Sequence, residues 1–306
     1  MYRPYLRGKQ YELLALRELL TKRKISSNFV QPIFEPIKET ATFRSTLQLF
    51  NDENYPLYTV INPAVGDFEK HDSNHPILED KNIQYDAVLM SDTEFDAYSV
   101  LSDSNGVIPI FFKVDDIAQA TNLASNDLSI TLSLIKDSSR LKRELKRMGH
   151  SVGLIRDAFD KKERNIDYSA NPDEFFSDDH LYYLEEGYEA FSDFSVVGEA
   201  YSDSGFAPVA VAIHIVYFDD TDALRIKHFV SDSNDDISNP AGKFSEALNK
   251  LIRWAKEQPE KNQSIALEEF KSLDLNRRYP GLGVVKKLSI MHHIEIMNNY
   301  LSGKRQ

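Results

Sequence analysis

Charged side chains follow several short apolar segments of this sequence, at the points where the strands of a parallel sheet would end. Arg7 and Lys9 follow the segment around Tyr5, and Glu35 and Lys38 follow the next apolar run. In a βα barrel, functional groups come from the carboxyl ends of the strands. Asn62, Arg156 and Glu199 follow later segments of the same kind. The candidate residues at the strand ends are therefore Arg7, Lys9, Glu35, Lys38, Asn62, Arg156 and Glu199.

Two kinds of chemistry suit this set of residues. The cations Arg7, Lys9 and Lys38 would hold a phosphate or carboxylate, and the N-terminus of the first helix favours an anion as well. The carboxylates Glu35 and Glu199 would be the catalytic acid and base, since a neighbouring cation decides which of the two stays ionised. A structural interpretation competes with both: the charges would form salt bridges that close the sheet between its first and last strands.

The elements that must position these residues alternate in the βα manner. Eight short apolar segments separated by helical patterns run from the segment around Tyr5 to "FSVVGEAY" at 194–201. This order predicts an α/β fold with a closed, TIM-barrel-like (β/α)8 sheet, and an open doubly wound α/β sheet is the alternative. In a closed barrel the eighth strand pairs with the first, which would bring Glu199 towards Arg7 and Glu35.

The pattern changes after the eighth segment. The apolar runs on either side of "DDTD" at 219–222 predict a β-hairpin, and three helical segments follow it, with "RYPGLG" as the turn before the last. A tyrosine- and acid-rich region at 172–190 is expected to be helical, and Ser91 with Glu94 forms a capping box. We therefore expect a barrel core at 1–205 and a hairpin with C-terminal helices at 206–306, packed together as one structural unit.

Two histidines are placed almost opposite each other by the predicted hairpin. These are His214 and His228, and Asp232 follows shortly after them. Two histidines and a carboxylate can bind a metal, but a histidine on an apolar strand is more often a hydrogen-bonded core residue, so we assign no metal and keep all three as ligand-binding candidates. His292 and Glu295 share one face of the last helix, where packing is favoured over a metal half-site.

The overall composition limits the classes of protein to be considered. The chain has 36 Lys+Arg against 48 Asp+Glu and no cysteine, so it carries a net charge of −12 and cannot form disulfides or thiolate metal sites. It has no leader-like N-terminus and no stretch near the roughly 20 apolar residues of a membrane span. We expect a soluble cytoplasmic protein.

Nucleic-acid binding is not favoured by the charge distribution. Sequence-independent binding to DNA needs many phosphates to be neutralised, and the basic helix around 140–147 has no interleaved aromatic residues for base stacking. Residues 165–224 contain no Lys or Arg, and this acidic stretch is either a solvated surface or a docking face for a basic partner. The P-loop, Rossmann, nucleophile-elbow and zincin signatures are absent.

Four stretches of the sequence resemble one known family. The stretches are "YLRGKQYELLAL", "PIFEPIK", "VVGEAYSDSG" and "VAIHIVYFDDTDALRIKHFVSDSN", and they resemble the beta protein family, named after a protein of a satellite phage. The resemblance implies a barrel-like fold and an association with phage-defence gene clusters. It implies no catalytic residues, because no such set is established for the family.

Together these observations lead to one functional hypothesis and one rival. The first is a component of a bacterial or prophage antiviral defence module, a barrel protein with an anion-binding mouth that binds a partner or ligand. Its expected partner is a protein from the same operon, and a phosphate-containing small molecule is a second expected ligand. The rival is a hydrolase that cleaves a phosphoester or glycosidic bond with the paired carboxylates Glu35 and Glu199.

Overall fold

The computed structural model describes residues 1–68, 83–90, 105–113, 130–202 and 208–303. It divides the chain into two compact units. The barrel unit comprises Met1–Leu13, Ser26–Asp157 and Tyr182–Phe194, and the hairpin unit comprises Leu14–Ile25, Ala158–Leu181 and Ser195–Gln306. The predicted capping box at Ser91 and Glu94 lies outside the described residues.

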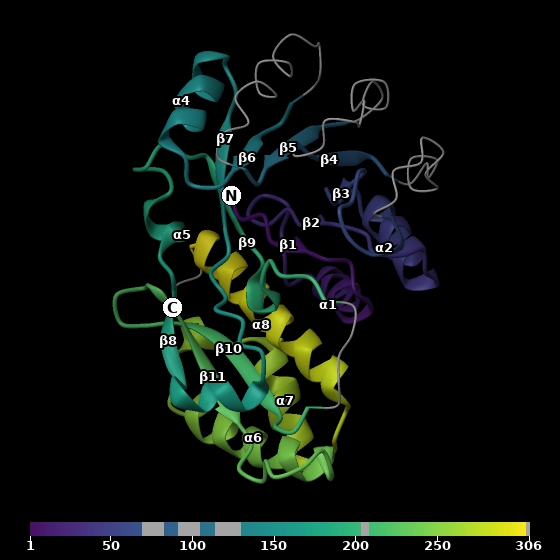
Figure 1. Ribbon diagram of the computed structural model, residues 1–306, viewed down its shortest axis with the longest axis vertical. Helices are drawn as coiled ribbons and strands as arrows, with labels where there is room; N and C mark the ends of the chain where they lie inside the picture. Colours follow the sequence, from purple (N-terminus) through teal and green to yellow (C-terminus); the bar gives the residue numbers. More distant parts are fainter. Residues whose placement is uncertain (69–82, 91–104, 114–129, 203–207, 304–306) are drawn as a thin grey trace. The chain divides into compact units, whose positions relative to one another are not determined.

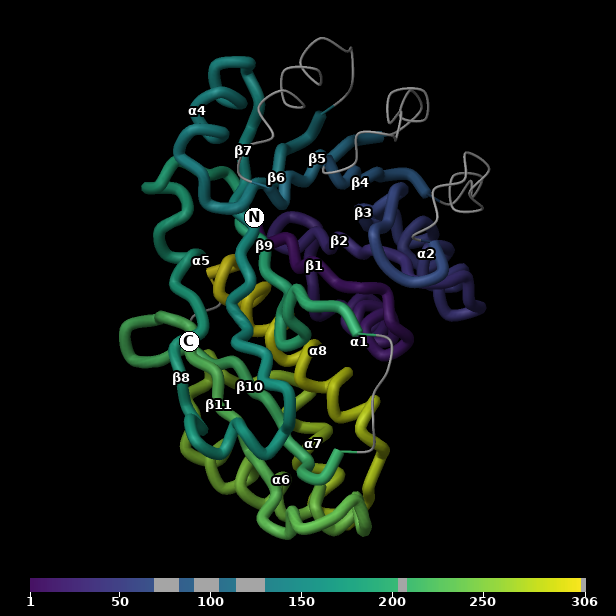
Figure 2. Tube along the Cα trace, viewed as in Figure 1, coloured from purple at the N-terminus to yellow at the C-terminus, as the bar shows by residue number. Residues whose placement is uncertain are grey.

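The barrel unit is built on an eight-stranded parallel sheet in the order β1-β2-β3-β4-β5-β6-β7-β9 (Figure 1). Its strands are β1 (Tyr5–Leu6), β2 (Ile33–Phe34), β3 (Tyr58–Val60), β4 (Tyr85–Leu89), β5 (Val107–Phe111), β6 (Ser133–Ile135), β7 (Val152–Arg156) and β9 (Ala190–Asp193). Tyr2 forms parallel bridges to both Val30 and Phe191, so the first strand joins the last. In Figure 2, β9 accordingly runs beside β1. The sheet is a nearly closed, TIM-barrel-like barrel, as predicted.

One strand of the barrel was predicted at the wrong place. The eighth strand is Ala190–Asp193, whereas Ser195–Val197, inside the predicted strand, forms a 3-10 helix with Ser195 at φ +49°. A short continuous apolar run does not reveal its secondary structure by periodicity. The true strand is paired in register with β7 from Gly153↔Ala190 to Arg156↔Asp193.

The interior of the barrel is filled by alternate residues of every strand, because side chains on a strand point to opposite faces in turn. They form one buried cluster, in which β3, β4 and β5 each place two residues. One member from each strand, in sheet order, is Tyr5, Ile33, Tyr58, Ala87, Ile108, Leu134, Ile155 and Ala190. This alternation decides which charged residues at the strand ends face inwards.

Helices of the barrel unit end where their local sequence predicts. Helix α2 (Ala41–Asp52) is capped by Thr40, whose Oγ1 accepts from the Phe43 N–H at 3.1 Å. Helix α4 (Ser139–Arg147) buries Leu141 and Leu145, and Gly149 follows it at φ +85°. The basic face of α4 is exposed, which agrees with a solvated surface.

The hairpin unit contains a three-stranded antiparallel sheet in the order β10-β11-β8. The predicted hairpin is confirmed: β10 (Ala212–Phe218) pairs with β11 (Leu224–Val230), and His214 is directly opposite His228. The third strand, β8 (Asp173–Ser177), lies in the region predicted to be helical, where only the short α5 (Asp179–Tyr182) is an α-helix. The prediction was wrong because β8 forms by pairing with β11, which is distant in the sequence. The local sequence pattern of β8 gives no sign of this pairing.

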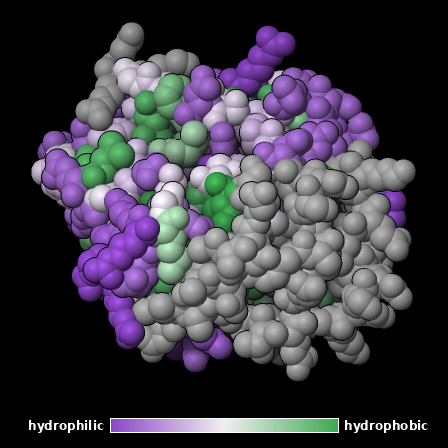
Figure 3. Space-filling model, turned by 90° about the horizontal axis from the view of Figure 1, so that it is seen from above, coloured by the Kyte–Doolittle hydropathy of each residue, from purple (hydrophilic) through white to green (hydrophobic). Residues whose placement is uncertain are grey.

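Three helices follow the hairpin, as predicted; the first and third of them pack on this sheet, and the second packs on the other two (Figure 1). They are α6 (Pro240–Ala255), α7 (Ile265–Leu275) and α8 (Leu282–Leu301). The first helix of the chain, α1, spans Gln10–Thr21. Within the described ranges, no helix is long and apolar enough to cross a membrane. On the face drawn in Figure 3, the apolar residues that are described form small separate groups among hydrophilic ones.

Candidate functional site

The ends of β1 and β2 carry a buried ion pair. Arg7 Nη1 donates to Glu35 Oε2, which also accepts from the Tyr5 hydroxyl at 2.7 Å. The other oxygen, Glu35 Oε1, accepts from the Ala64 backbone N–H at 2.7 Å. Glu35 is 0% exposed and Arg7 8% exposed. Both oxygens of this carboxylate are therefore engaged inside the protein.

Gly8 explains how the two strand ends come so close. Its φ is +63°, and a Cβ placed on it would lie 2.9 Å from the Glu35 carbonyl oxygen and 3.2 Å from Pro36 Cα. Only glycine adopts this conformation readily and leaves space for the neighbouring backbone. At the end of the first strand, Arg7 thus binds a carboxylate that follows β2, and Gly8 allows the two backbones to approach each other.

Aromatic rings and a second cation lie beside this pair at the barrel mouth. The Arg7 guanidinium carbon is 5.7 Å from the centroid of the Phe194 ring, and Phe194 stacks with Phe112 at 6.2 Å. Lys136 Nζ lies 5.6 Å from the centroid of Phe112. The Asn62 amide extends the sheet, because it donates to the Leu89 carbonyl and accepts from the Leu89 N–H, both at 2.8 Å.

The other residues predicted at the mouth are distributed differently. Lys9 is half-buried, and its carbonyl accepts from the Glu12 and Leu13 N–H groups in the first turn of α1, while Lys38 is exposed. Arg156 is in register with Asp193 at the end of β7. Glu199 follows the 3-10 helix at Ser195–Val197 and does not end a barrel strand. The reasoning that placed it next to Glu35 therefore no longer holds.

The two hairpin histidines contact each other, as predicted. Their Nδ1 atoms are 2.8 Å apart, so one donates to the other, and His228 Nε2 lies 3.2 Å from Glu174 Oε1. The Tyr168 ring covers both imidazoles, with centroids at 4.5 and 4.6 Å. Burial lowers the pKa of His214 to about 3 and also lowers that of His228. This is a hydrogen-bonded core pair.

Asp232, the third residue of the predicted group, is bound elsewhere. Its carboxylate pairs with Lys250 Nζ at 2.6 Å on the surface. The carboxylate beside the histidines is Glu174 from β8, a strand that the sequence did not reveal. The described residues include no group of three or more His, Asp or Glu side chains arranged to hold a metal ion.

His292 and Glu295 have a role that neither sequence interpretation anticipated. His292 Nδ1 accepts from Ser264, the N-cap of α7, at 2.8 Å, and its Nε2–H donates to the Val216 carbonyl at 2.8 Å. Glu295 Oε2 accepts from the Ile265 N–H at 2.9 Å. These two side chains of α8 satisfy polar groups at the start of α7, where backbone N–H groups lack helical partners.

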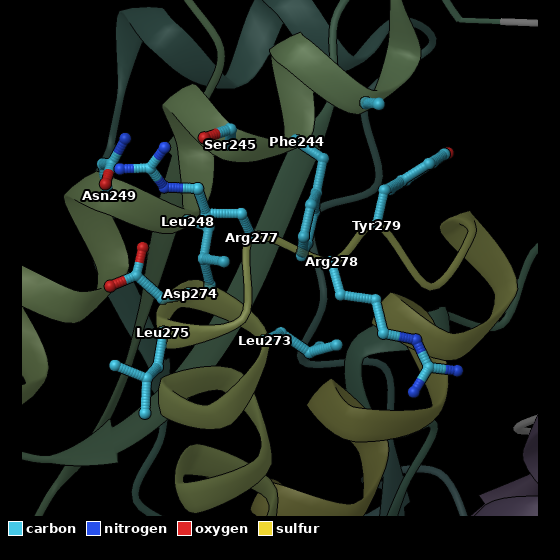
Figure 4. A pocket seen from close by; sticks show the side chains of 11 residues that line it. Phe244, Ser245, Leu248, Asn249, Leu273, Asp274, Leu275, Arg277, Arg278 and Tyr279 are labelled. Atoms are coloured by element: carbon cyan, nitrogen blue, oxygen red, sulfur yellow. The ribbon is translucent and has the colours of Figure 1, made fainter.

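A recess of about 520 Å³ opens between α6, the end of α7 and the turn before α8 (Figure 4). Phe244, Leu248 and Leu273 contribute apolar side chains, and Tyr279 packs on Phe244 with ring centroids 5.4 Å apart. In Figure 4 two guanidinium groups lie on either side of these apolar groups. They belong to the exposed residues Arg277 and Arg278.

Both guanidinium groups of the recess are available to a ligand. Neither Arg277 nor Arg278 forms a side-chain hydrogen bond or ion pair with any residue of the described ranges. Sequence reasoning missed them because they do not follow a strand. The available signal was the pair "RR" immediately after a helix and before "YPG".

Comparison with known proteins adds no identification. No family model, no curated protein and no solved structure matches the chain significantly.

Proposed function

We propose that this chain is a partner-binding cytoplasmic component of a bacterial or prophage antiviral defence module, with the barrel as its scaffold. The proposal is supported by one contrast in the charged residues. The cation and the carboxylate at the ends of β1 and β2 are bound to each other, whereas the side chains of Arg277 and Arg278 in the recess have no hydrogen-bond or ion-pair partner among the residues that the structure describes. The defence role follows from the resemblance of four sequence stretches to the beta protein family.

The recess supports a specific kind of partner. Its volume of about 520 Å³ is within the range of ligand sites, about 300–1,000 Å³. Apolar side chains between two arginines suit a peptide segment that places an apolar residue beside an acidic one, because guanidinium groups pair strongly with carboxylates. The partner is a protein from the same operon that carries such a segment. A phosphate-containing small molecule is a second ligand for these cations, and nucleic acid is not proposed.

The rival function, hydrolysis by Glu35 and Glu199, is less well supported. A general acid or base must reach the proton that it transfers. Glu35 is fully buried and accepts hydrogen bonds on both oxygens, and the strand that would have carried Glu199 ends at Asp193. The partner-binding function needs neither carboxylate.

Charge reversal in the recess tests the proposal. Tagged protein from its native cells should copurify with the product of a neighbouring gene, and the two purified proteins should bind in calorimetry. The variant R277E/R278E should bind about tenfold or more weakly, because each lost charged contact is worth about 1.5–3 kcal/mol. The variant R253E/K256E is the control, since it makes the same charge change on two exposed residues outside the recess, one at the end of α6 and one directly after it.

Two results would contradict the proposal. If no neighbouring gene product copurifies above background, the partner-binding function is wrong. If a partner binds equally well to wild type and to R277E/R278E, the recess is not the binding site.

A further inference from the structure

Arg3 is a cation inside the barrel. It alternates with Tyr5 on the first strand, so both side chains lie on the inner face of the sheet. Its guanidinium carbon is 4.8 Å from the centroid of Tyr58, a member of the interior cluster. Arg3 is only 5% exposed. The sequence pattern "YRPYLR" contained this signal, because Arg3, Tyr5 and Arg7 recur at every second residue.

Within the described part of the chain, the guanidinium of Arg3 lacks the counter-charge that Arg7 has. Its Nε and Nη1 atoms are buried and have no hydrogen-bond partner. Among the residues that the structure describes, no carboxylate forms an ion pair with it. Burial lowers the pKa of Arg3, and the Tyr58 hydroxyl partly offsets this effect, but an arginine keeps its proton in proteins. A buried, uncompensated cation costs far more than its contact with one aromatic ring returns.

A second orphaned polar group lies on the neighbouring strand. Tyr2 bridges to Phe191, so the residues that follow them, Arg3 and Ser192, are also neighbours across the junction of the first and last strands. Ser192 shares the inner face with Ala190 and is 1% exposed. Its Oγ is buried without a hydrogen-bond partner. Neighbouring positions at this junction therefore carry two N–H groups and one hydroxyl that lack hydrogen-bond partners among the described residues, whereas buried polar groups are satisfied in almost all native proteins.

We propose that Arg3 and Ser192 bind a phosphate-type oxyanion inside the barrel. The anion supplies the charge that Arg3 lacks, and its several oxygens accept from both N–H groups and from the Ser192 hydroxyl at once. The site lies in the barrel unit and does not depend on the recess or on the partner proposed above.

The test uses the full chain and inorganic phosphate as the probe. Thermal unfolding is followed over a phosphate series at constant ionic strength, for wild type, R3M, S192A and R140M. The last variant is the control, because it removes the same charge from the exposed face of α4. Phosphate should raise the Tm of wild type and R140M in a saturable manner, since a ligand that binds only the folded state stabilises it.

The variants should respond in different ways. R3M should lose the response to phosphate, and without phosphate it should unfold at a higher temperature than wild type, because an uncompensated buried charge is gone. S192A retains the cation and should bind phosphate several-fold more weakly. If glycerol phosphate raises the Tm as much as inorganic phosphate does, the site accepts a phosphate ester. If only inorganic phosphate raises the Tm, the ligand is the free ion.

Three outcomes would overturn the proposal. The first is a wild-type Tm that does not change with phosphate. The second is a response of R3M and S192A that matches that of wild type. The third is equal stabilisation by chloride at the same concentration. Chloride is not an oxyanion, so an equal effect would show general stabilisation by salt and not binding at an oxyanion site.

Discussion

Acidification from pH 7 to pH 5 should destabilise the hairpin unit through its buried histidines. His292 and His293 are both 0% exposed on α8. Burial lowers the pKa of His292 to about 4 and that of His293 to about 3, while the unfolded chain has the ordinary value of about 6.5. Because these pKa values are depressed by folding, their contribution to stability is complete above pH 6.5 and is lost as the pH falls towards 4.

The magnitude follows from proton linkage. At pH 5 each histidine is protonated in the unfolded chain and neutral in the folded one, which costs about 2 kcal/mol relative to pH 7. The two histidines together cost about 4 kcal/mol, a large part of the 5–15 kcal/mol that is typical of a domain. Burial raises the pKa of Glu295, which acts in the opposite direction and matters mainly nearer its own pKa.

Urea unfolding monitored by Trp254 fluorescence measures this effect in the hairpin unit, to which Trp254 belongs. Trp254 is the single tryptophan of the sequence and packs against Tyr217 and Phe229, with ring centroids at 5.2 and 5.5 Å. The free energy of unfolding should fall by about 4 kcal/mol or more between pH 7 and pH 5 in wild type, because burial also lowers the pKa of His180 and of His214 in the same unit. In H292Q the fall should be about 2 kcal/mol smaller than in wild type, whatever the absolute stability of that variant. An equal fall in wild type and H292Q would refute the reasoning.

Two further predictions concern the junction of β1 and β2. E35Q should lower the free energy of unfolding in urea by about 3–5 kcal/mol, because Arg7 remains buried without its counter-charge; a stable E35Q protein that loses a measured hydrolytic activity would instead support a catalytic role. G8A should lower the free energy of unfolding by more than about 1 kcal/mol for two reasons. The alanine Cβ would clash with the Glu35 carbonyl oxygen, and an alanine is strained at the positive φ of this position. G149A, at φ +85° with nothing within 4 Å, is the control and should cost less, and an equal cost in both variants would show that the close approach is unimportant.

Periodic patterns in the sequence predicted the architecture because they are local. The alternation of apolar segments and helical patterns indicated the barrel, and the turn of the hairpin is held by nearby groups. Asp219 Oδ1 accepts from the Thr221 N–H at 2.8 Å and from the Ala223 N–H at 3.2 Å, and this turn sets His214 opposite His228. The prediction was wrong where a strand depends on a distant partner, at β8, and where an apolar run has no periodicity, at 195–197.

The candidate sites show the same division more sharply. The sequence by itself determined that Arg7 and Glu35 follow the first two strands of the sheet. Only the tertiary structure decided that Glu35 is fully buried and bonded to Arg7, that no described carboxylate pairs with Arg3, and that Arg277 is exposed. The physical reason is that the availability of a charge depends on its partners and its burial, and both are set by residues far away in the chain.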